Sequence, residues 1–251
     1  TRKNLTLGFP EDFNKLDLSQ GYNEHTKNLE PIPHRIIDNG PVLENVLEGD
    51  AIDITKFPAP LWNPADGGRY IGTGCFIITR DPDTGWINCG TYRVMVHDEK
   101  RVALYISPGK HGRIHRGQYM AKGEPMRVCI VVGTDPLSFL TSSTEAPEGM
   151  CELDMMGAYR GHAIECVNGK HTGLPFPATS EVVIEGFIHP GNTAPEGPFG
   201  EWLGYQGGRM EAEPWVDVSA IYHRNDPILL GAAHIRLPYE YARYRPIRRP
   251  A

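Results

Sequence analysis

The sequence lacks several features that would assign a class of function at once. No stretch approaches the roughly 18 consecutive apolar residues of a membrane-spanning helix, and the first residues, Thr-Arg-Lys-Asn-Leu-Thr, lack the apolar core of a secretory signal. An excess of positive charge is also missing, because 25 Lys and Arg face 31 Asp and Glu, a formal net charge of -6. These absences argue against nucleic acid or an anionic membrane as the main partner. We therefore expect a cytoplasmic protein that acts on a small molecule or a protein partner.

The cysteines form no paired pattern. Five are scattered through the 251 residues, and none belongs to a Cys-x-x-Cys pair. The sequence therefore predicts neither a disulfide framework nor a zinc ribbon, and a reducing compartment fits best. A P-loop and a dinucleotide fingerprint are missing too, which disfavours nucleotide hydrolysis and Rossmann-type chemistry. The chain does not begin with Met, so we expect a processed or trimmed piece.

The local composition divides the chain into three segments. Residues 1–65 are rich in Pro, Asp, Asn and Gly, which predicts an irregular lead-in with one or two short elements. Residues 66–235 alternate short β-branched and aromatic runs with turns, a pattern typical of strands, and residues 236–251 form a basic extension. We predict an α+β fold with a partly closed barrel. The predicted strands are 75–79, 92–97, 102–106, 126–132, 182–188 and 216–223, and the predicted helices are 113–122, 137–140, 149–157 and 238–244.

Two carboxylates and an arginine are the most informative residues. Glu196 and Glu201 flank a Gly-Pro turn, and Arg93 stands alone earlier in the chain. A rigid turn can aim both acids in one direction, and a guanidinium between them can keep one ionised while the other exchanges a proton. The pattern favours acid/base chemistry on a carboxylate substrate. On its own, however, such a turn is more often a solvated surface loop.

A possible metal-ligand set is spread along the sequence. Asn88, His111 and Glu152 offer an amide oxygen, an imidazole and a carboxylate, which suit manganese or magnesium better than zinc. A histidine that hydrogen-bonds to backbone is the simpler interpretation of His111 alone. His111 and His115 have the spacing of a helical metal site, but Gly112 between them favours the start of a helix, and we set that pair aside.

Two kinds of loop could contact a phosphate or a cation. The run Thr141-Ser142-Ser143-Thr144 can bind phosphate or a monovalent cation, although capping and turn formation are the usual explanation. The loops Gly72-Thr73-Gly74 and Ser107-Pro108-Gly109-Lys110 could approach a phosphate closely, with Lys110 as a point charge.

Several of these motifs together resemble those of the UbiD-type decarboxylases. That family includes ferulic acid decarboxylase and the hydroxyarylic acid decarboxylases, and its members use prenylated FMN. The resemblance covers about residues 65–235, and its motifs come in order and at compatible separations. It implies a UbiD-like split β-barrel, related to flavin reductases, with flanking helices. The motifs are Tyr70-Ile71-Gly72-Thr73, residues 88–93, Pro108-Gly109-Lys110-His111, Ser142-Ser143, Glu152, residues 177–186, residues 196–201 and Leu203-Gly204-Tyr205.

The resemblance implies a role for each matching position. Arg93, Glu196 and Glu201 match a Glu-Arg-Glu catalytic network in which Glu201 donates a proton and the other two orient the substrate and tune the flavin. The implied ligands of a divalent ion that holds the cofactor phosphate are Asn88, His111 and Glu152. The implied potassium ligands are Cys89, Thr141, Ser142, Thr144 and Glu152. The implied cofactor contacts are Thr73, Asn88, Gly90, Thr91, Tyr92, Arg93, Lys110, His111, Ser142, Ser143 and Glu152.

The implied activity is a reversible, non-oxidative decarboxylation of an aromatic or α,β-unsaturated carboxylic acid. Loss of carbon dioxide from an sp2 carbon leaves a high-energy carbanion, so an electron sink is required. The resemblance supplies that sink as prenylated FMN, with a covalent substrate–cofactor adduct. It also implies Mn2+ or Mg2+, K+, and a flavin prenyltransferase that supplies the cofactor.

The sequence departs from the family pattern in ways that leave alternatives open. The family's C-terminal domain is expected to be absent or truncated here, so a homo-oligomer, or a hetero-oligomer with a chain that supplies the missing regions, is expected. Lys110 replaces a common polar amide, and Thr144-Glu145 replace an apolar residue and a proline, which could alter potassium binding. A non-catalytic cofactor-binding or assembly subunit of a split decarboxylase is the first alternative. A flavin-dependent oxidoreductase is a less favoured one.

Overall fold

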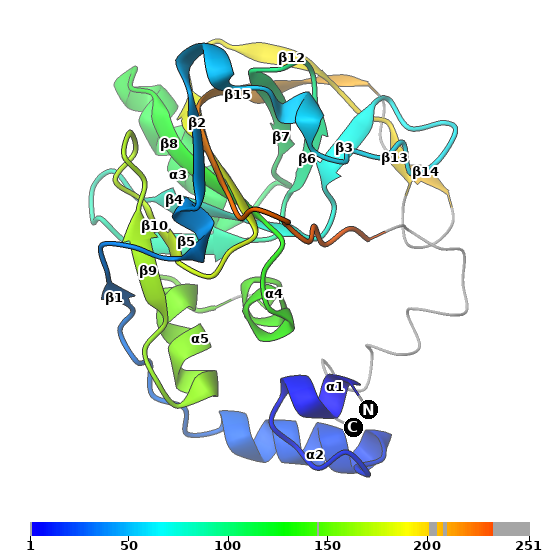
Figure 1. The fold of residues 1–251 in the computed structure, drawn as a ribbon, viewed down its shortest axis with the longest axis vertical. Helices are drawn as coiled ribbons and strands as arrows, with labels where there is room; N and C mark the ends of the chain where they lie inside the picture. The colour runs from blue at the N-terminus through cyan, green and yellow to red at the C-terminus, as the bar shows by residue number, and fades with distance from the viewer. Residues whose placement is uncertain (1, 145, 201–204, 208–209, 233–251) are drawn as a thin grey trace.

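A curled antiparallel sheet forms the centre of the computed structural model, which describes residues 2–144, 146–200, 205–207 and 210–232 (Figure 1). The sheet has 10 strands, in the order β3-β6-β7-β15-β11-β8-β4-β5, with β12 and β2 also paired to β15. Its strands are β2 (Asn45–Glu48), β3 (Arg69–Gly72), β4 (Cys75–Arg80), β5 (Ile87–Gly90), β6 (Arg93–Val96), β7 (Arg101–Tyr105), β8 (Met126–Val132), β11 (Val182–Ile188), β12 (Thr193–Glu196) and β15 (Glu211–His223).

The sheet is buried on both faces because alternate side chains enter two different apolar clusters. In β4, Ile77 packs inside the barrel, whereas Phe76 and Ile78 pack on the outer face. This is the two-residue period of a strand. The strands β8 and β11 read as nearly continuous apolar runs for the same reason, since both faces of each are covered.

Helices and smaller sheets surround the barrel. Helix α3 (His111–Lys122) packs against β4, β5 and β8, and helices α4 (Pro136–Ser142) and α5 (Glu152–Arg160) pack against each other. A second sheet joins β1 (Arg35–Ile36), β9 (Glu165–Asn168) and β10 (Pro175–Pro177), and a third joins β13 (Phe199–Gly200) and β14 (Gln206–Gly207). Short 3-10 turns, η1 (Pro41–Leu43), η2 (Gly49–Ala51) and η3 (Ile54–Lys56), lie in the lead-in.

An N-terminal helical hairpin, α1 (Arg2–Thr6) and α2 (Lys15–Thr26), lies beyond α5 at the opposite end from the barrel (Figure 1). Asn14 caps α2 by accepting hydrogen bonds from the backbone N–H groups of Leu16 and Asp17. The phenol groups of Tyr22 and Tyr159, 3.1 Å apart, connect α2 to α5.

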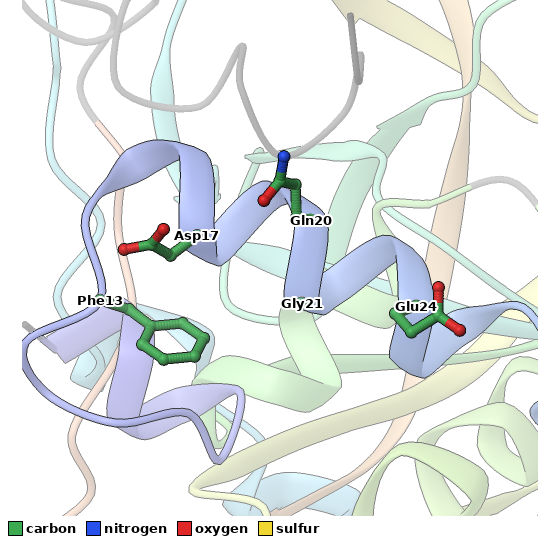
Figure 2. A pocket seen from close by; sticks show the side chains of 5 residues that line it. All are labelled: Phe13, Asp17, Gln20, Gly21 and Glu24. Atoms are coloured by element: carbon green, nitrogen blue, oxygen red, sulfur yellow. The ribbon is translucent and has the colours of Figure 1, made fainter.

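The outer side of this hairpin carries a shallow, acidic hollow. Figure 2 shows Asp17, Gln20 and Glu24 projecting from α2, with the Phe13 ring beside them and Gly21 between them. No residue of this hollow contributes to the polar cavity described below.

The predicted fold class and most predicted elements are confirmed. Strands 126–132 and 182–188 have their predicted bounds, Gly123 ends α3 in the left-handed region with φ 69°, and Asp135 caps α4. The lead-in carries more regular structure than the one or two short elements predicted, and α5 begins at Glu152 rather than at residue 149. The predicted helix 238–244 lies outside the described residues. The division into three segments stays a prediction.

The cysteines are unpaired, and the helices do not reach membrane-spanning length in the described residues. All five cysteines are free thiols, and burial raises the pKa of each of the four innermost, Cys75, Cys89, Cys129 and Cys166. None of the helices in the described part of the chain is both long and apolar enough to cross a bilayer.

Candidate functional site

Arg93 and Glu196 form a buried, two-pronged ion pair. Arg93 begins β6 and Glu196 ends β12, so two strands far apart in the sequence bring the side chains together. Arg93 Nε donates to Glu196 Oε1 and Nη2 donates to Oε2, both at 2.7 Å. Glu196 is only 1% exposed. This fork geometry fixes the direction of both groups as well as their charge.

Tyr70 is the third member of this cluster. Its phenol, fully buried on β3, donates to Glu196 Oε1 at 2.9 Å. Burial and the negative charge of Glu196 raise the pKa of Tyr70, so the phenol keeps its proton. Glu196 is the acceptor in all three hydrogen bonds, two at Oε1 and one at Oε2. The sequence motif contains Tyr70, but only the structure gives it this contact.

Two aromatic rings hold the guanidinium of Arg93. Its Cζ lies 4.2 Å from the centroid of the Tyr105 ring and 5.2 Å from that of Phe199. Burial works to lower the pKa of Arg93, but the hydrogen bonds and charge of Glu196 outweigh it and raise that pKa. The arginine is therefore a fixed cation.

The loop after Glu196 is anchored to the segment before β3. Gly67 donates its N–H to Pro198 O at 2.8 Å, and a Cβ at Gly67 would lie 1.9 Å from Gly197 O. Asp66 Oδ1 accepts from Gly200 N at 3.0 Å. The close approach explains the glycine at position 67 and holds the Gly-Pro turn against the segment before β3.

A small polar cavity of about 50 Å3 lies between the β5–β6 connection, α3 and the facing ends of α4 and α5. It brings together most of the residues that the sequence nominated for metal, potassium and cofactor binding. Its lining residues are Asn88, Cys89, Gly90, Thr91, Tyr92, Lys110, His111, Ser142, Ser143, Thr144 and Glu152.

Glu152 is the negative charge of this cavity. It begins α5, is 2% exposed, and accepts a hydrogen bond from Cys89 N through Oε2 at 2.7 Å. Burial raises the pKa of Glu152 to about 7, against the opposing effect of the Cys89 N–H. Within the described part of the chain no cationic side chain pairs with it. A buried carboxylate in this situation is suited to a bound cation.

Asn88 lines the same cavity. Its Nδ2 lies 3.3 Å from Thr79 Oγ1 and 3.5 Å from the Tyr92 hydroxyl, so the nitrogen end of the amide has two acceptors and the oxygen end is left for a ligand. Among the described residues no donor reaches Oδ1. With the imidazole of His111, the cavity offers the oxygen and nitrogen donors that suit Mn2+ or Mg2+.

The Tyr92 ring forms a wall of the cavity and explains two glycines. A Cβ at Gly90 would lie 2.3 Å from the Tyr92 hydroxyl, and one at Gly112 would lie 2.8 Å from the ring. The Tyr92 hydroxyl also accepts from Gly112 N at 3.2 Å, at the start of α3. Only glycine fits at these positions while the ring keeps its place.

The hydroxyl run at the end of α4 is only partly gathered at the cavity. Ser142, Ser143 and Thr144 line it, and each donates its hydroxyl hydrogen to a carbonyl of α4, at 2.8 to 3.0 Å. Their oxygens keep lone pairs for a cation. Thr141 is not among the lining residues, and its hydroxyl donates to Leu137 O at 2.9 Å.

Comparison with known proteins assigns the family. Residues 35–236 match the UbiD family, described as the 3-octaprenyl-4-hydroxybenzoate carboxy-lyase Rift-related domain. The chain belongs to the UbiD family. It is 35% identical over 229 residues to the pyrrole-2-carboxylic acid decarboxylase of Pseudomonas aeruginosa, covering 91% of this chain and 46% of that protein. The UbiD-family chain thus spans about half the length of the curated relatives it matches.

Solved UbiD-class structures share the fold. The vanillic acid decarboxylase of Sedimentibacter hydroxybenzoicus in its closed form matches with a TM-score of 0.88 and 29% identity, over 96% of this chain and 52% of that one. HmfF from Pelotomaculum thermopropionicum, in complex with prenylated FMN, matches with a TM-score of 0.81 and 30% identity, over 93% of this chain and 54% of that one. The predicted UbiD-like split barrel is confirmed.

The structure places neither Thr73 nor Glu201, two residues that the sequence predicted for the site, in the Arg93–Glu196–Tyr70 cluster or in the lining of the cavity. Thr73 is not among the lining residues of the cavity, and its hydroxyl accepts from Ala232 N at 2.9 Å. Glu201 lies outside the described residues, as do Leu203 and Gly204 of the same motif. The role of each nominated residue stays a prediction, although the structure places Arg93 with Glu196 and gathers the other cofactor and metal candidates except Thr73 and Thr141 at one cavity.

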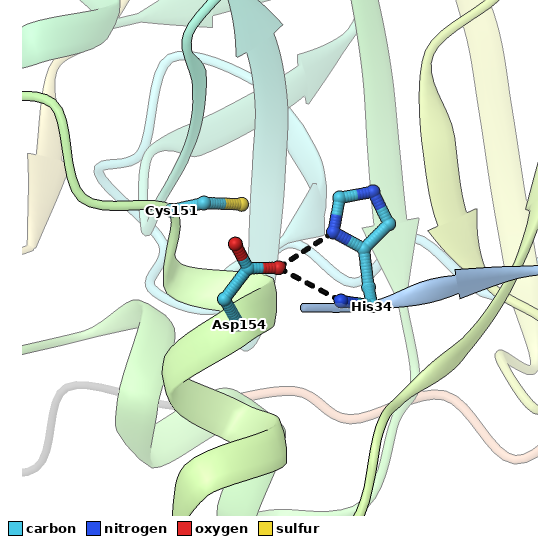
Figure 3. A group of neighbouring side chains, drawn as sticks. All are labelled: His34, Cys151 and Asp154. Atoms are coloured by element: carbon cyan, nitrogen blue, oxygen red, sulfur yellow. Dashed lines mark hydrogen bonds and ion pairs between the residues drawn. The ribbon is translucent and has the colours of Figure 1, made fainter. Parts of the chain in front are cut away.

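His34, in the lead-in, contacts Asp154 in the first turn of α5, a contact that was not predicted from the sequence. Figure 3 shows His34 Nδ1 and His34 N both reaching Asp154 Oδ1, at 2.7 and 2.9 Å, with the Cys151 thiol close by. Burial works to raise the pKa of Asp154, but the hydrogen bonds from His34 outweigh it and lower that pKa. The contact holds the lead-in against the first turn of α5, next to Glu152. A separation of 120 residues along the chain hides this pair from any local motif.

Proposed function

We propose that this chain is the cofactor-binding part of a reversible, non-oxidative decarboxylase. Its substrate is an aromatic or α,β-unsaturated carboxylic acid, and its cofactor is prenylated FMN. The observation that carries the proposal is the buried cluster of Arg93, Glu196 and Tyr70, beside a cavity whose donors suit a divalent ion. The decarboxylase descriptions of the relatives and the prenylated FMN complex of HmfF support it.

The cavity residues would hold the cofactor phosphate through metal ions. Asn88, His111 and Glu152 would bind Mn2+ or Mg2+, because they supply a neutral oxygen, a nitrogen and a carboxylate. Lys110 at the start of α3 would add a positive charge for the phosphate. Potassium would use the carbonyl of Cys89 and the oxygens of Ser142, Thr144 and Glu152, with Thr141 the weakest candidate of that set.

The two glutamates would divide the acid/base work. When bound, prenylated FMN supplies the electron sink for the charge left by the departing carbon dioxide. Both oxygens of Glu196 accept hydrogen bonds from Arg93 and one also accepts from Tyr70, so Glu196 is better placed to orient groups than to pass a proton to the substrate. The proton for the substrate carbon would therefore come from Glu201, while Arg93 and Glu196 orient the substrate. The covalent attachment of substrate to flavin stays a prediction.

The rest of the catalytic machinery would come from outside these residues. Because the chain spans about half of its relatives, we infer that a further segment or chain supplies walls of the substrate pocket. Assembly as a homo-oligomer or hetero-oligomer is part of this proposal. The vanillic acid decarboxylase structures support a second chain, since they are described as VdcCD and one contains a truncated VdcD. A flavin prenyltransferase would supply the cofactor.

The experiment is co-expression with a flavin prenyltransferase and with the segment or chain that completes the substrate pocket, followed by a carbon dioxide release assay on aromatic and unsaturated acids. We expect Glu201→Gln to abolish release while flavin stays bound. Glu211→Gln is the matched control, because Glu211 is exposed and pairs in register with Glu196 across β12 and β15. Full turnover by Glu201→Gln would contradict the proposed proton donor, and a purified protein without modified flavin would contradict the cofactor.

A cofactor-carrying or assembly subunit is the second candidate, favoured by the half-length match to the relatives. It predicts that a partner chain restores turnover and that Arg93→Ala leaves this turnover unchanged. A loss of turnover in Arg93→Ala, with the assembly intact, would decide for the catalytic role.

A further inference from the structure

Three buried polar side chains are connected in a row, from Asn88 at the cavity through Thr79 to His115. Thr79 on β4 and Asn88 on β5 are register partners, so their side chains stand next to each other on one face of the sheet. Thr79 is fully buried and Asn88 is 2% exposed. The Thr79 hydroxyl oxygen lies 3.3 Å from Asn88 Nδ2 and 2.9 Å from His115 Nδ1.

His115 is held in one place by its helix and by an indole ring. It lies one turn after His111 on α3 and is fully buried. The Trp86 ring contacts both imidazoles edge-on, with centroids 4.8 Å from His111 and 5.1 Å from His115. The two histidines therefore share a face of α3, but they do different work, because His111 lines the cavity and His115 faces the sheet.

The charges around His115 set which of its nitrogens carries the proton. Burial lowers the pKa of His115 to about 4, so the imidazole is neutral. Burial works to raise the pKa of Asp81, but the backbone N–H groups of Thr84 and Asp83 outweigh it and lower that pKa to about 2. His115 Nε2 lies 3.9 Å from this carboxylate, and although it has no hydrogen-bond partner among the described residues, the negative charge favours the proton on Nε2. Nδ1 is then an acceptor, and the Thr79 hydroxyl donates to it.

This direction decides the orientation of the Asn88 amide. Once the hydroxyl hydrogen of Thr79 points to His115, the Thr79 oxygen can only accept from Asn88. The NH2 end of Asn88 is therefore turned toward Thr79 and the oxygen end toward the cavity. The Tyr92 hydroxyl, 3.5 Å from the same nitrogen, offers a second acceptor.

We propose that Thr79, oriented by His115, is a positioning residue that fixes the Asn88 amide with its oxygen toward a divalent cation. The inference rests on the proposed function, because it takes Asn88 as a metal ligand. Groups that orient metal ligands in this way typically change metal affinity by about 10- to 100-fold when they are removed. A merely structural role for Thr79 would change the stability of the barrel and leave that affinity unchanged.

The experiment measures Mn2+ binding to the purified, chelator-treated protein by electron paramagnetic resonance titration, with no substrate or flavin present. Thr79→Val keeps the shape of the side chain and removes the hydroxyl, and we expect the Mn2+ dissociation constant to rise about 10- to 100-fold. Thr79→Ser restores the hydroxyl and should remain close to wild type.

A matched control separates affinity from packing. Thr172→Val also removes a buried threonine hydroxyl, one that donates to Glu185 at 2.7 Å, in a network that contributes nothing to the cavity lining. It should lower the melting temperature and leave the dissociation constant unchanged. Asn88→Ala, which removes the proposed ligand itself, should weaken binding at least as much as Thr79→Val.

The outcomes distinguish the inference from the function beneath it. Unchanged affinity in Asn88→Ala would overturn the proposed metal site. Weakened affinity in Asn88→Ala with wild-type affinity in Thr79→Val would overturn this inference alone, and so would an equal loss in Thr79→Val and Thr79→Ser. Nitrogen-15 NMR of the His115 ring gives an independent readout, since we expect the proton on Nε2. A proton on Nδ1 would overturn the orientation argued here.

Discussion

Replacing Arg93 by methionine should destabilise the protein far more than replacing an exposed arginine of the same barrel. Methionine keeps much of the apolar stem and its packing but removes the charge and both hydrogen bonds to Glu196. Glu196 is 1% exposed and, among the described residues, would keep the Tyr70 phenol as its one side-chain donor. Removal of one partner of a buried ion pair typically costs about 3 to 5 kcal/mol. The side chain of Arg93 is itself 15% exposed, which favours the lower half of that range.

The assay is urea unfolding of the flavin-free protein, with thermal unfolding as a second measure. For a chain of this size each kcal/mol shifts the melting temperature by about 2 to 4 °C, so a loss of about 3 to 4 kcal/mol in Arg93→Met should lower it by about 6 to 16 °C. The matched control is Arg101→Met. Arg101 also pairs with a carboxylate and lies over an aromatic ring, Trp215, but its side chain is 47% exposed, and its loss should barely change stability.

A double variant tests whether the charge of Glu196 is the cause. In Arg93→Met combined with Glu196→Gln, neither position carries a charge, so the double variant should be much less destabilised than the sum of the two single variants. An Arg93→Met protein as stable as Arg101→Met, or purely additive effects in the double variant, would refute the buried ion pair as described.

Three further predictions concern the same two clusters. Tyr70→Phe removes a hydrogen bond to a carboxylate and should lower the free energy of unfolding by about 1.5 to 3 kcal/mol, measured by urea titration; an unchanged value would contradict the contact. Mn2+ affinity should rise about tenfold per pH unit up to about pH 7 and level off above it, because a proton on Glu152 (pKa about 7) competes with the cation below that pH. Calorimetric titrations at several pH values measure this affinity, and a flat profile would contradict the prediction. Gly90→Ala should push the Tyr92 ring from its place and lower stability by about 1 to 3 kcal/mol, whereas Gly117→Ala, in open space on α3, should be neutral or stabilising in the same assay.

The barrel strands that were predictable share one property. β8 and β11 are buried on both faces, so each reads as a nearly continuous apolar run with visible ends, interrupted only by Arg127 in β8 and by Glu185-Gly186 in β11. The first part of β15, residues 211–215, was hidden because it carries glutamates and Pro214 and pairs with β12, which itself contains Pro195. An edge pairing tolerates these residues, and propensity alone argues against them.

The N-terminal helix α2 had a usable signal that the prediction did not exploit. Its face is mostly polar and contains Gly21, so hydrophobic periodicity is weak. Asn14 and Asp17, however, form a capping box, which marks a helix start by local chemistry. The lead-in was therefore predicted as irregular, although the local sequence marks the start of α2.

The residues of the candidate site also fall into two groups, those that a local motif reveals and those that only the fold brings into place. Residues 88–93 and the hydroxyl run of α4 are continuous motifs, so the cavity could be anticipated from them. Tyr70, Thr79 and His34 act through partners that only strand register or tertiary contact supplies. Side chains that hold a functional group in place leave no motif of their own, because their spacing in the sequence is set by the fold.

Native mass spectrometry of the protein after co-expression with a flavin prenyltransferase tests the central claim most directly. We predict a mass that exceeds the polypeptide by one prenylated FMN and a divalent ion, and the loss of both in Glu152→Ala. A bare polypeptide mass for the folded wild-type protein, or an unchanged ligand complement in Glu152→Ala, would contradict the assignment of this cavity as the cofactor-phosphate site.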